Sequence, residues 1–285
     1  MAIDLSSFEL LMFQQRGRRL DVTIDAPPMN VMVVELYVEL DRLSIELDAD
    51  ADADDSALVV VFRSSDPLFF IAHFDVNPLI AMAGRSRPVE QLDELGTFHA
   101  MCERFRTMPV VSIADIRGRI GGGGAELAAS FDMRFGAEHV MVLNQMEVPL
   151  GILPGGSGTQ RLPHLVGRGR AMEIVLGGVD VDAETLETWG WLNRSLPEAD
   201  LGRYVDDIAD RIASFDPVAV RAAKASVLAA MPDPTPGLRA EADLFATTVH
   251  RPEAAAAMRQ FLVNGGQTRE GEQQMMSITQ GLFEA

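Results

Sequence analysis

Four consecutive glycines at 121–124 are followed by Ala125 and then by an acid, Glu126, within the stretch GRIGGGGAELAASFD (118–132). Each glycine weakens a regular element by about 0.5–1 kcal/mol relative to alanine, so the run indicates that the backbone approaches something closely. N–H groups at the start of a helix suit a phosphate, or an oxygen that becomes negative during a reaction. A glutamate would repel phosphate, whereas it can act as acid or base beside a developing anion. Tight helix–strand packing, with Glu126 only complementing the helix dipole, is the open alternative.

A second acid, Glu147, lies in NQMEVPLGILPGGSGTQRL (144–162), after a predicted strand and before many prolines and glycines. Dense turn residues around a single acid with apolar neighbours predict a carboxylate that is held at a cleft and partly removed from water. Such burial raises the pKa of a carboxyl group towards neutrality. The alternative is an ordinary surface acid near a turn.

Four segments follow one another along the chain in this order: IDAPPMNVM, FIAHFD, GRIGGGGAELA and MEVPLGILPGGSGTQRL. Together they resemble the enoyl-CoA hydratase/isomerase family, also called the crotonase superfamily, over roughly residues 10–230. The last two segments are similar to the family's G-x-A-x-G-G-G-C-E-L-A and P-E-x-x-L-G-x-x-P-G-x-G-G-T-Q-R-L motifs. The resemblance implies an α/β fold, in which ββα turns form a crotonase-like spiral of two nearly perpendicular sheets. It also implies a helical C-terminal module that mediates trimer formation.

The resemblance implies a thioester site whose oxyanion hole is made by the N–H groups of Phe74 and Gly123. It further implies that Glu126 and Glu147 are catalytic and flank a water molecule. Glu147 would shuttle the proton, and Glu126 would orient the water and help to deprotonate it. The other residues that it places around the substrate and its coenzyme A are Met29, Asn30, Ala72, His73, Asp75 and Gly122.

The sequence departs from the family pattern in three places. His73 and Phe74 stand where the family has glycine and a small residue in the first oxyanion loop. The segment DAPPMN lacks the basic residue that is often found there. The C-terminal GGQTREGEQQMMSITQGLFEA differs from the family's common ending. His73 is therefore either a catalytic base or a histidine packed and hydrogen-bonded under the loop.

We expect an enoyl-CoA hydratase, which adds water across the C2–C3 double bond of an enoyl-CoA thioester. One alternative is a Δ3,Δ2-enoyl-CoA isomerase or another enolate chemistry, which would need Glu147 far more than Glu126. Another is a catalytically silent acyl-thioester-binding protein. We expect no cofactor beyond the coenzyme A of the substrate, and no metal, because the histidines are scattered and no cysteines are paired. The expected partners are the acyl-CoA and further copies of the chain in a trimer or hexamer.

The charge and composition exclude other classes of function. A net charge of −18, from 24 Lys+Arg against 42 Asp+Glu, disfavours nucleic acid and anionic membranes as partners. No apolar run reaches the roughly 18–20 residues of a membrane span. Asp4 and Glu9 lie where a signal peptide would carry positive charge. The single cysteine, Cys102, allows no intramolecular disulfide, and these features together predict a cytoplasmic protein.

Strands alternate with helices up to about residue 197, and helices alone follow. This predicts an α/β core at 1–197 that holds the acyl-CoA site, and a helical oligomerisation module at 198–285. An acidic run at 48–55 is predicted to be a solvated loop. The predicted strands are 8–14, 19–25, 57–64, the first part of 66–75, which leads into a loop, 109–118 and two within 133–144. The predicted helices are 31–49, 88–108, 125–131, two within 153–178 separated at Pro163 and Gly167, 199–213, 217–230 and about 236–263.

Overall fold

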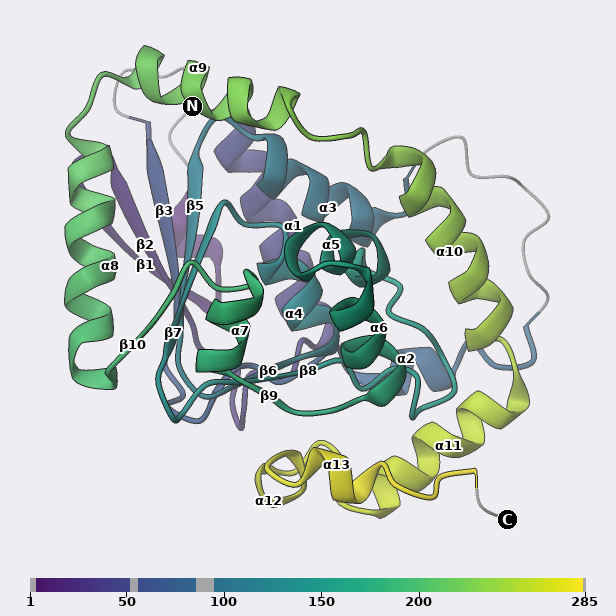
Figure 1. The fold of residues 1–285 in the computed structure, drawn as a ribbon. Helices are drawn as coiled ribbons and strands as arrows, with labels where there is room; N and C mark the ends of the chain where they lie inside the picture. Colours follow the sequence, from purple (N-terminus) through teal and green to yellow (C-terminus); the bar gives the residue numbers. More distant parts are fainter. Residues whose placement is uncertain (1–3, 52–55, 86–94, 284–285) are drawn as a thin grey trace.

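The computed structural model describes residues 4–51, 56–85 and 95–283, and it arranges them as two β-sheets surrounded by helices (Figure 1). The larger sheet has the strand order β1-β2-β3-β5-β7-β10, and the smaller has the order β4-β6-β8-β9. The strands are β1 (Leu11–Arg16), β2 (Arg19–Ile24), β3 (Val59–Ser64), β4 (Phe69–Ile71), β5 (Val111–Ile116), β6 (Arg119–Gly121), β7 (Met133–Ala137), β8 (Val142–Asn144), β9 (Val181–Asp182) and β10 (Arg194–Leu196).

Three successive pairs of strands divide between the sheets in the same way. The first strand of each pair, β3, β5 or β7, lies parallel to its neighbours in the larger sheet. The second strand, β4, β6 or β8, lies in the smaller sheet, where these three strands run parallel to one another and β9 is antiparallel to β8. The chain therefore winds from one sheet to the other in repeated turns, as the sequence predicts. Apolar runs such as VVVF in β3 fit this arrangement, because parallel strands are usually covered on both faces.

The longer helices α1, α3 and α8 each bury one apolar face. In α1 (Val34–Ala49) the buried leucines recur every three or four residues, and this face packs against α3 (Thr97–Thr107). The other helices before residue 197 are the 3₁₀ helix η1 (Leu5–Ser7), α2 (Val76–Ile80), α4 (Gly122–Ala128), α5 (Gly158–Val166), α6 (Arg168–Gly177) and α7 (Ala183–Trp189).

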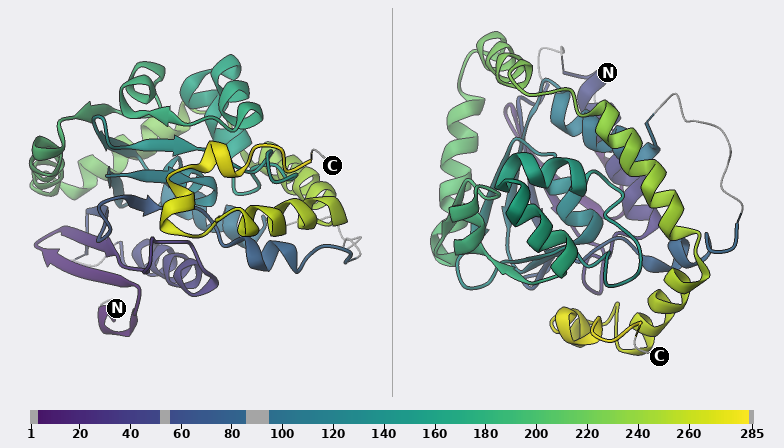
Figure 2. Two further views of the ribbon diagram at one scale, coloured as in Figure 1. Left: turned by 90° about the horizontal axis from the view of Figure 1, so that it is seen from below. Right: turned by 45° about the vertical axis from the view of Figure 1, so that its right-hand side comes forward.

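The C-terminal helices pack on the core at several places. The helix α8 (Glu198–Ala213) lies along the larger sheet, where Leu201 and Val205 share a hydrophobic cluster with β3 and β5 (Figure 1). Further along the chain, α10 (Thr235–Val249) contacts α5, and α11 (Pro252–Val263) contacts α2. The last helices, α12 (Arg269–Glu272) and α13 (Met275–Ile278), lie at the end of the molecule opposite α9 (Pro217–Ala229) (Figure 2). A division at residue 197 and a role in oligomerisation stay predictions. These helices are α9 (Pro217–Ala229), α10 (Thr235–Val249), α11 (Pro252–Val263), α12 (Arg269–Glu272) and α13 (Met275–Ile278).

Most differences from the predicted elements involve glycine or proline. The helix α4 begins at Gly122, inside the glycine run, instead of at residue 125. Pro163 lies within α5 instead of separating two helices, because it forfeits only one backbone hydrogen bond near the end of a short helix. The single helix predicted at about 236–263 is in fact two, because Pro252 starts α11 and cannot continue α10. The segment 66–75 forms a strand that leads into a loop, as predicted, with the strand limited to β4 and the loop at 72–75.

Some predicted elements extend beyond the described residues. The helix predicted at 88–108 is described only from 95, and α3 begins at Thr97. Positions 52–55 of the predicted acidic loop also lie outside the described residues. The short elements β9, α7 and β10 have no counterpart among the predicted elements. Within the described ranges, no helix is long and apolar enough to span a membrane.

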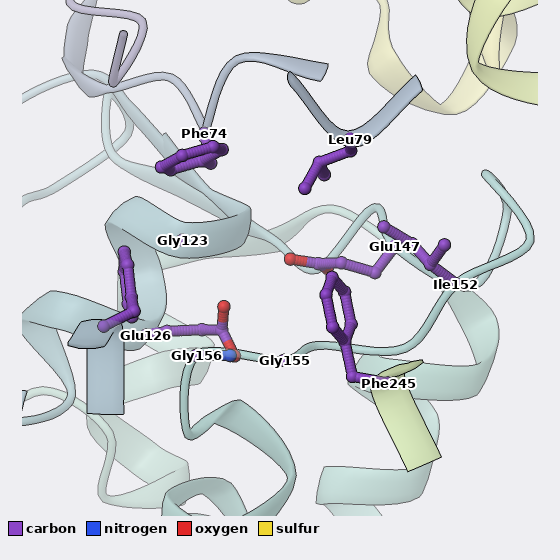
Figure 3. Close-up of a pocket in the computed structure, with 10 residues that line it drawn as sticks. Phe74, Leu79, Gly123, Glu126, Glu147, Ile152, Gly155, Gly156 and Phe245 are labelled. Carbon is purple, nitrogen blue, oxygen red and sulfur yellow. The ribbon is translucent and has the colours of Figure 1, made fainter. Parts of the chain in front are cut away.

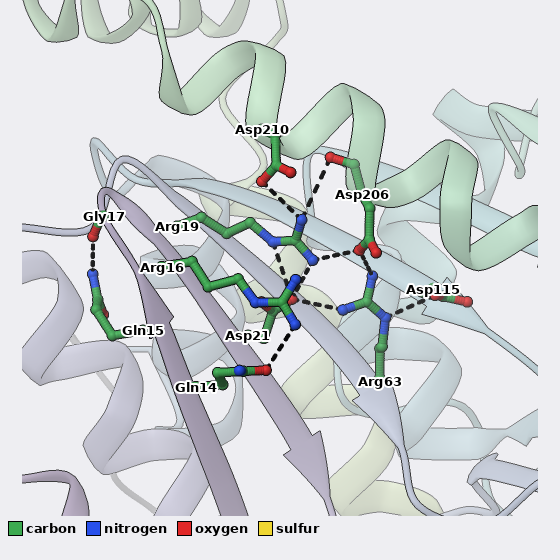
Figure 4. Close-up of polar contacts among 10 residues, drawn as sticks. All are labelled: Gln14, Gln15, Arg16, Gly17, Arg19, Asp21, Arg63, Asp115, Asp206 and Asp210. Carbon is green, nitrogen blue, oxygen red and sulfur yellow. Dashed lines mark hydrogen bonds and ion pairs between the residues drawn. The ribbon is translucent and has the colours of Figure 1, made fainter.

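An arginine–aspartate cluster fastens α8 to the larger sheet (Figure 4). The Arg19 side chain is fully buried and donates hydrogen bonds to Asp21 (2.6 Å) and to Asp206 of α8. Arg63 of β3 donates to the same two aspartates, at 2.6 Å each. Buried charges of this kind are stable only when each has its partners. The cluster comprises Arg19, Asp21, Arg63, Asp115, Asp206 and Asp210.

We predict that Arg19→Met lowers the free energy of unfolding by about 3 kcal/mol, because it removes one of the two arginines that neutralise the buried Asp21 and the nearby Asp206. The matched control is Arg203→Met, since Arg203 forms an exposed pair with Asp200 on the same helix. The control should change stability by no more than about 0.5 kcal/mol. Urea-induced unfolding measures both variants. Equal losses would show that the cluster contributes no more than a surface ion pair.

Candidate active site

A pocket lies between the loop after β4, the start of α4 and the loop before α5 (Figure 3). It has a volume of about 160 Å³ and mostly apolar walls. The carboxylates of Glu126 and Glu147 both point into it. Four residues that the sequence predicts for the site therefore meet here, since Phe74 and Gly123 also line the pocket. The lining residues are Phe74, Leu79, Phe98, Gly123, Glu126, Glu147, Ile152, Gly155, Gly156 and Phe245.

The glycine run packs directly against β4 and the loop that follows it. A Cβ atom added at any of positions 121–124 would come within 2.6–3.2 Å of an atom of that segment. Gly122 also has φ +44°, a conformation that favours glycine. Side chains at these positions would push the two segments apart. The residues that positions 121 to 124 face are, in order, Ala72, His73, Phe74 and Ile71.

The predicted oxyanion donors, the N–H groups of Phe74 and Gly123, are neighbours at the pocket wall. A Cβ on Gly123 would lie 3.8 Å from the Phe74 nitrogen. Gly123 is in the first turn of α4, where the helix supplies no acceptor for an N–H group. The His73 carbonyl accepts a hydrogen bond from Met32 N (2.8 Å). Because a trans peptide directs its C=O and N–H to opposite sides, this bond turns the Phe74 N–H away from Met32.

Glu126 is a buried carboxyl group held by backbone donors. Its Oε1 accepts hydrogen bonds from the N–H groups of Gly156 (2.8 Å) and Gly158 (2.7 Å). Burial raises the pKa of Glu126 well above its usual value, and the charges of Glu147 and Glu241 raise it further. The two N–H groups lower the pKa, but by less. Glu126 thus has a fixed orientation and retains its proton at a higher pH than an exposed glutamate.

Glu147 lies three residues after the end of β8, and it is also buried. The Gln145 amide, with its NH₂ group turned towards Glu147, donates to Oε2 at 2.9 Å. Burial raises the pKa of Glu147 to about 7. The Glu241 charge also raises the pKa, while the backbone N–H of Glu147 and the His73 charge oppose the rise. Glu147 is therefore a buried acid with a near-neutral pKa, as its sequence context predicts.

A third buried carboxylate, Glu241 of α10, holds the loop before α5 from the other side. The Glu126 carboxylate binds the glycine N–H groups of this loop, whereas Ser157 N (2.6 Å) and Thr159 N (3.0 Å) donate to Glu241. His99 Nε2 lies 3.0 Å from Glu241 Oε1. The N–H groups of residues 156 and 158 therefore orient Glu126, and those of residues 157 and 159 orient Glu241. Sequence reasoning missed Glu241, because no local pattern separates it from the surface acids of its helix.

The apolar wall was also missed, because its side chains come from separate elements. Phe98 belongs to α3 and Phe245 to α10. Tyr37 of α1 stacks on Phe98, with ring centroids 5.7 Å apart, and meets the Phe74 ring edge-on at 6.2 Å. Phe74, where the family has a small residue, thus joins an aromatic wall. No group of three or more His, Cys, Asp or Glu among the described residues is arranged to hold a metal ion.

Several residues predicted to contact the substrate lie behind the pocket wall. Met29 and Ala72 are buried in a small apolar cluster. Asn30 is buried as well, and its amide donates to Ser64 Oγ (2.7 Å) and to the Phe70 carbonyl (3.1 Å). These contacts connect the loop before α1 to β4. Roles of these residues in binding the substrate stay predictions.

His73 and Asp75 belong to the loop between β4 and α2. Asp75 caps α2 by accepting a hydrogen bond from Asn77 N (3.0 Å). The His73 ring is buried, with Nδ1 2.7 Å from the Phe74 carbonyl oxygen and Nε2 3.0 Å from Glu272 Oε1. Both ring nitrogens are bound within the protein, which favours a packed histidine over a catalytic base.

We predict that Gly124→Ala lowers the free energy of unfolding by about 1–3 kcal/mol, because the new Cβ would lie 2.7 Å from the Ile71 carbonyl oxygen. Gly169→Ala is the matched control, since a Cβ at this position of α6 meets nothing within 4 Å. The control should leave stability unchanged or raise it by about 0.4–1 kcal/mol. Urea unfolding of both variants checks the prediction. It is wrong if Gly124→Ala is as stable as the control.

Comparisons with known proteins identify the family and the fold. The family model for enoyl-CoA hydratase/isomerase matches residues 19–267. The crystal structure of a candidate enoyl-CoA hydratase from Streptomyces avermitilis has a TM-score of 0.86 and 35% identity, covering 98% of this chain and 100% of that one.

Two curated relatives match less of the sequence or at lower identity. The short-chain-enoyl-CoA hydratase of Clostridium acetobutylicum is 28% identical over 257 residues, which are 88% of this chain and 94% of that protein. The enoyl-CoA isomerase/hydratase fer4 of Mycosarcoma maydis is 31% identical over 169 residues, which are 59% of this chain and 60% of that protein. The chain belongs to the enoyl-CoA hydratase/isomerase family and has the α/β crotonase fold.

Proposed function

We propose that this chain is an enoyl-CoA hydratase, which adds water across the C2–C3 double bond of an enoyl-CoA thioester. The observation that supports this most is the presence of two buried carboxyl groups with raised pKa values in one pocket, beside two neighbouring backbone donors. Two acids flanking a small space suit a reaction that both gives and takes a proton. Coenzyme A enters as part of the substrate, and the reaction needs no further cofactor.

The thioester carbonyl oxygen would lie between the N–H groups of Phe74 and Gly123. As the water oxygen bonds to C3, electrons of the double bond move towards the carbonyl and produce an enolate-like state. The donors then stabilise the negative charge on that oxygen, and each such donor contributes about 2.7–4 kcal/mol in enzymes of this type. Because both donors are backbone groups in closely packed segments, they need little rearrangement during the reaction.

The two glutamates would share one proton and exchange it with the reactants. Glu147, in its acid form, delivers a proton to C2, while Glu126 orients the water and receives a proton from it as the oxygen bonds to C3. One proton has left the pair and another has entered, so transfer between the two carboxyl groups restores the starting state. The hydrogen bonds from Gly156 and Gly158 to Glu126 Oε1 leave Oε2 as the oxygen that contacts the water.

The isomerase alternative needs one carboxyl group that moves a proton between two carbons. In that reaction Glu126 would have little catalytic role. Its burial and its two backbone hydrogen bonds favour the hydratase, because a second acid is held in place at the same pocket. The same observation disfavours a silent thioester-binding protein. Assembly into a trimer or hexamer through residues 198–285 stays a prediction.

We predict that Glu126→Gln and Glu147→Gln each lower kcat for hydration by about 10²–10⁴-fold, because each removes a positioned acid or base. KM should change by less than about threefold, since substrate contacts remain. Loss of the enoyl-thioester absorbance across short, medium, branched and aromatic enoyl-CoAs measures the rates. Glu173→Gln, an exposed position on α6, is the matched control.

Undiminished hydration activity in the Glu126→Gln variant would contradict the hydratase proposal. If that variant still moves a Δ3 double bond to Δ2, while Glu147→Gln does not, the isomerase alternative is correct. Binding of a saturated acyl-CoA without turnover of any enoyl-CoA would indicate the silent thioester-binding protein.

We also predict a bell-shaped pH dependence of kcat/KM for the wild type. Burial raises the pKa of Glu147 to about 7, so the proton donor persists to that pH and is lost above it. Activity should therefore fall as the pH rises through about 7, and fall again in acid when the second carboxyl group is protonated. The charged groups facing Glu147 are Glu126, Glu241 and His73. An upper limb that persists in Glu147→Gln would contradict the assignment.

A further inference from the structure

The C-terminal segment 264–272 contacts the loop between β4 and α2. The chain turns after α11, so that Glu272 of α12 reaches the His73 ring at 3.0 Å. Gln267 donates from Nε2 to Asp75 Oδ1 (2.9 Å), and its Oε1 accepts from Val76 N (3.2 Å). One segment near the end of the chain therefore holds two residues of the loop that carries the Phe74 N–H, and the first residue of α2.

The two ring nitrogens of His73 both face hydrogen-bond acceptors. Nδ1 is 2.7 Å from the Phe74 carbonyl oxygen, and Nε2 is 3.0 Å from a carboxylate oxygen of Glu272. A neutral imidazole has only one N–H, so it would turn a lone pair towards one of these oxygens. The same Glu272 oxygen also accepts from Gln267 N (2.8 Å), as expected of a carboxylate. A charged imidazolium satisfies both contacts.

The electrostatics of the surroundings support this pairing. Burial alone would lower the pKa of His73, but the Glu272 carboxylate and the Phe74 carbonyl raise it overall. Burial would raise the pKa of Glu272, but His73 and the Gln267 N–H lower it overall. Glu147 also faces His73, since a Cβ on the intervening Gly122 would lie 3.0 Å from Glu147 Oε1 and 3.1 Å from His73 Cβ.

We propose that Glu272 keeps His73 as an imidazolium, and that the charged ring positions Phe74 as an oxyanion donor. Phe74 lies between two peptide units that are both fixed. The first is held by the bond from Met32 N to the His73 carbonyl (2.8 Å). The second is held by two bonds, one from His73 Nδ1 to the Phe74 carbonyl and one from Asp75 N to the Met32 carbonyl (3.1 Å). With both units held, the Phe74 N–H keeps its direction towards the pocket. This inference rests on the proposed function, because it names what holds the proposed donor.

The protonation state is tested directly in the wild-type full-length chain. In protein labelled with ¹⁵N-histidine, the His73 signals are assigned by their absence from His73→Asn. We expect both ring nitrogens of His73 to stay protonated at a pH above the usual histidine pKa of about 6.5. In Glu272→Gln, one nitrogen should lose its proton at that pH. A neutral His73 ring in the wild type would overturn the inference, and this measurement needs no variant to fold.

The positioning role is tested by kinetics with Glu272→Gln, and with Glu270→Gln as the control. Glu270 is an exposed glutamate two residues away on the same short helix. We expect Glu272→Gln to lower kcat by about 10–100-fold with KM within about threefold, because a displaced donor acts on the transition state more than on binding. Glu270→Gln should match the wild type. An unchanged kcat, or a loss that appears only in KM, would overturn the positioning role.

A spectroscopic measurement separates this inference from the proposed function. The absorbance band of an aryl-conjugated enoyl-CoA shifts to longer wavelength when hydrogen bonds polarise its carbonyl. We expect the shift on binding to the wild type to shrink in Glu272→Gln and to persist in Glu270→Gln. If the wild type hydrates no enoyl-CoA but shows this difference, the proposed function fails and the inference stands. An equal shift in all three proteins overturns the inference whatever the activity.

Discussion

The close contact between two backbone segments, 121–124 and 71–74, is the constraint on which the site depends. The strands β4 and β6 are parallel neighbours in the smaller sheet, so both strands end at the same edge of the sheet. The segments that follow must then pack against each other, and an added Cβ at any of the four glycines would come within 2.6–3.2 Å of the opposing segment. The same contact places the N–H groups of Phe74 and Gly123 side by side. The glycine run therefore allows tight packing and also brings the two N–H groups together. The packing interpretation and the oxyanion interpretation of the run are thus compatible.

Placing three buried carboxyl groups around one pocket is unfavourable, and the surrounding backbone offsets part of that cost. The loop before α5 divides its N–H groups between Glu126 and Glu241. These bonds orient the acids without cancelling the effect of burial on Glu126, whose pKa remains raised. Glu241 is absent from the pocket lining, yet its charge raises the pKa of both lining acids. The chemistry of the site thus depends on a residue of α10, far along the chain.

Residues whose roles depend on local sequence could be predicted, whereas those defined by distant contacts could not. Glu126 and Glu147 stand out because their own neighbours in sequence are glycines and prolines that form the pocket edge. The helix α1 and the strands β1, β2, β3, β5 and β7 follow from the pattern of their apolar side chains, whereas the short β10 of the same sheet does not. By contrast, Glu241, Phe245 and Glu272 look like ordinary members of polar or amphipathic helices. Periodicity identifies the buried face of a helix, but it does not identify what that face contacts.

Two departures from the family pattern that look unrelated in the sequence meet in the structure. A histidine at position 73 brings a ring into a buried loop where the family has glycine, and that ring needs acceptors for its N–H groups. The unusual C-terminal segment supplies one of them, the buried Glu272. Either change alone would bury an unpaired charge or an unsatisfied polar group, and this is costly in a protein interior. Their contact makes each change tolerable, and it makes the geometry of the loop depend on how the end of the chain is packed.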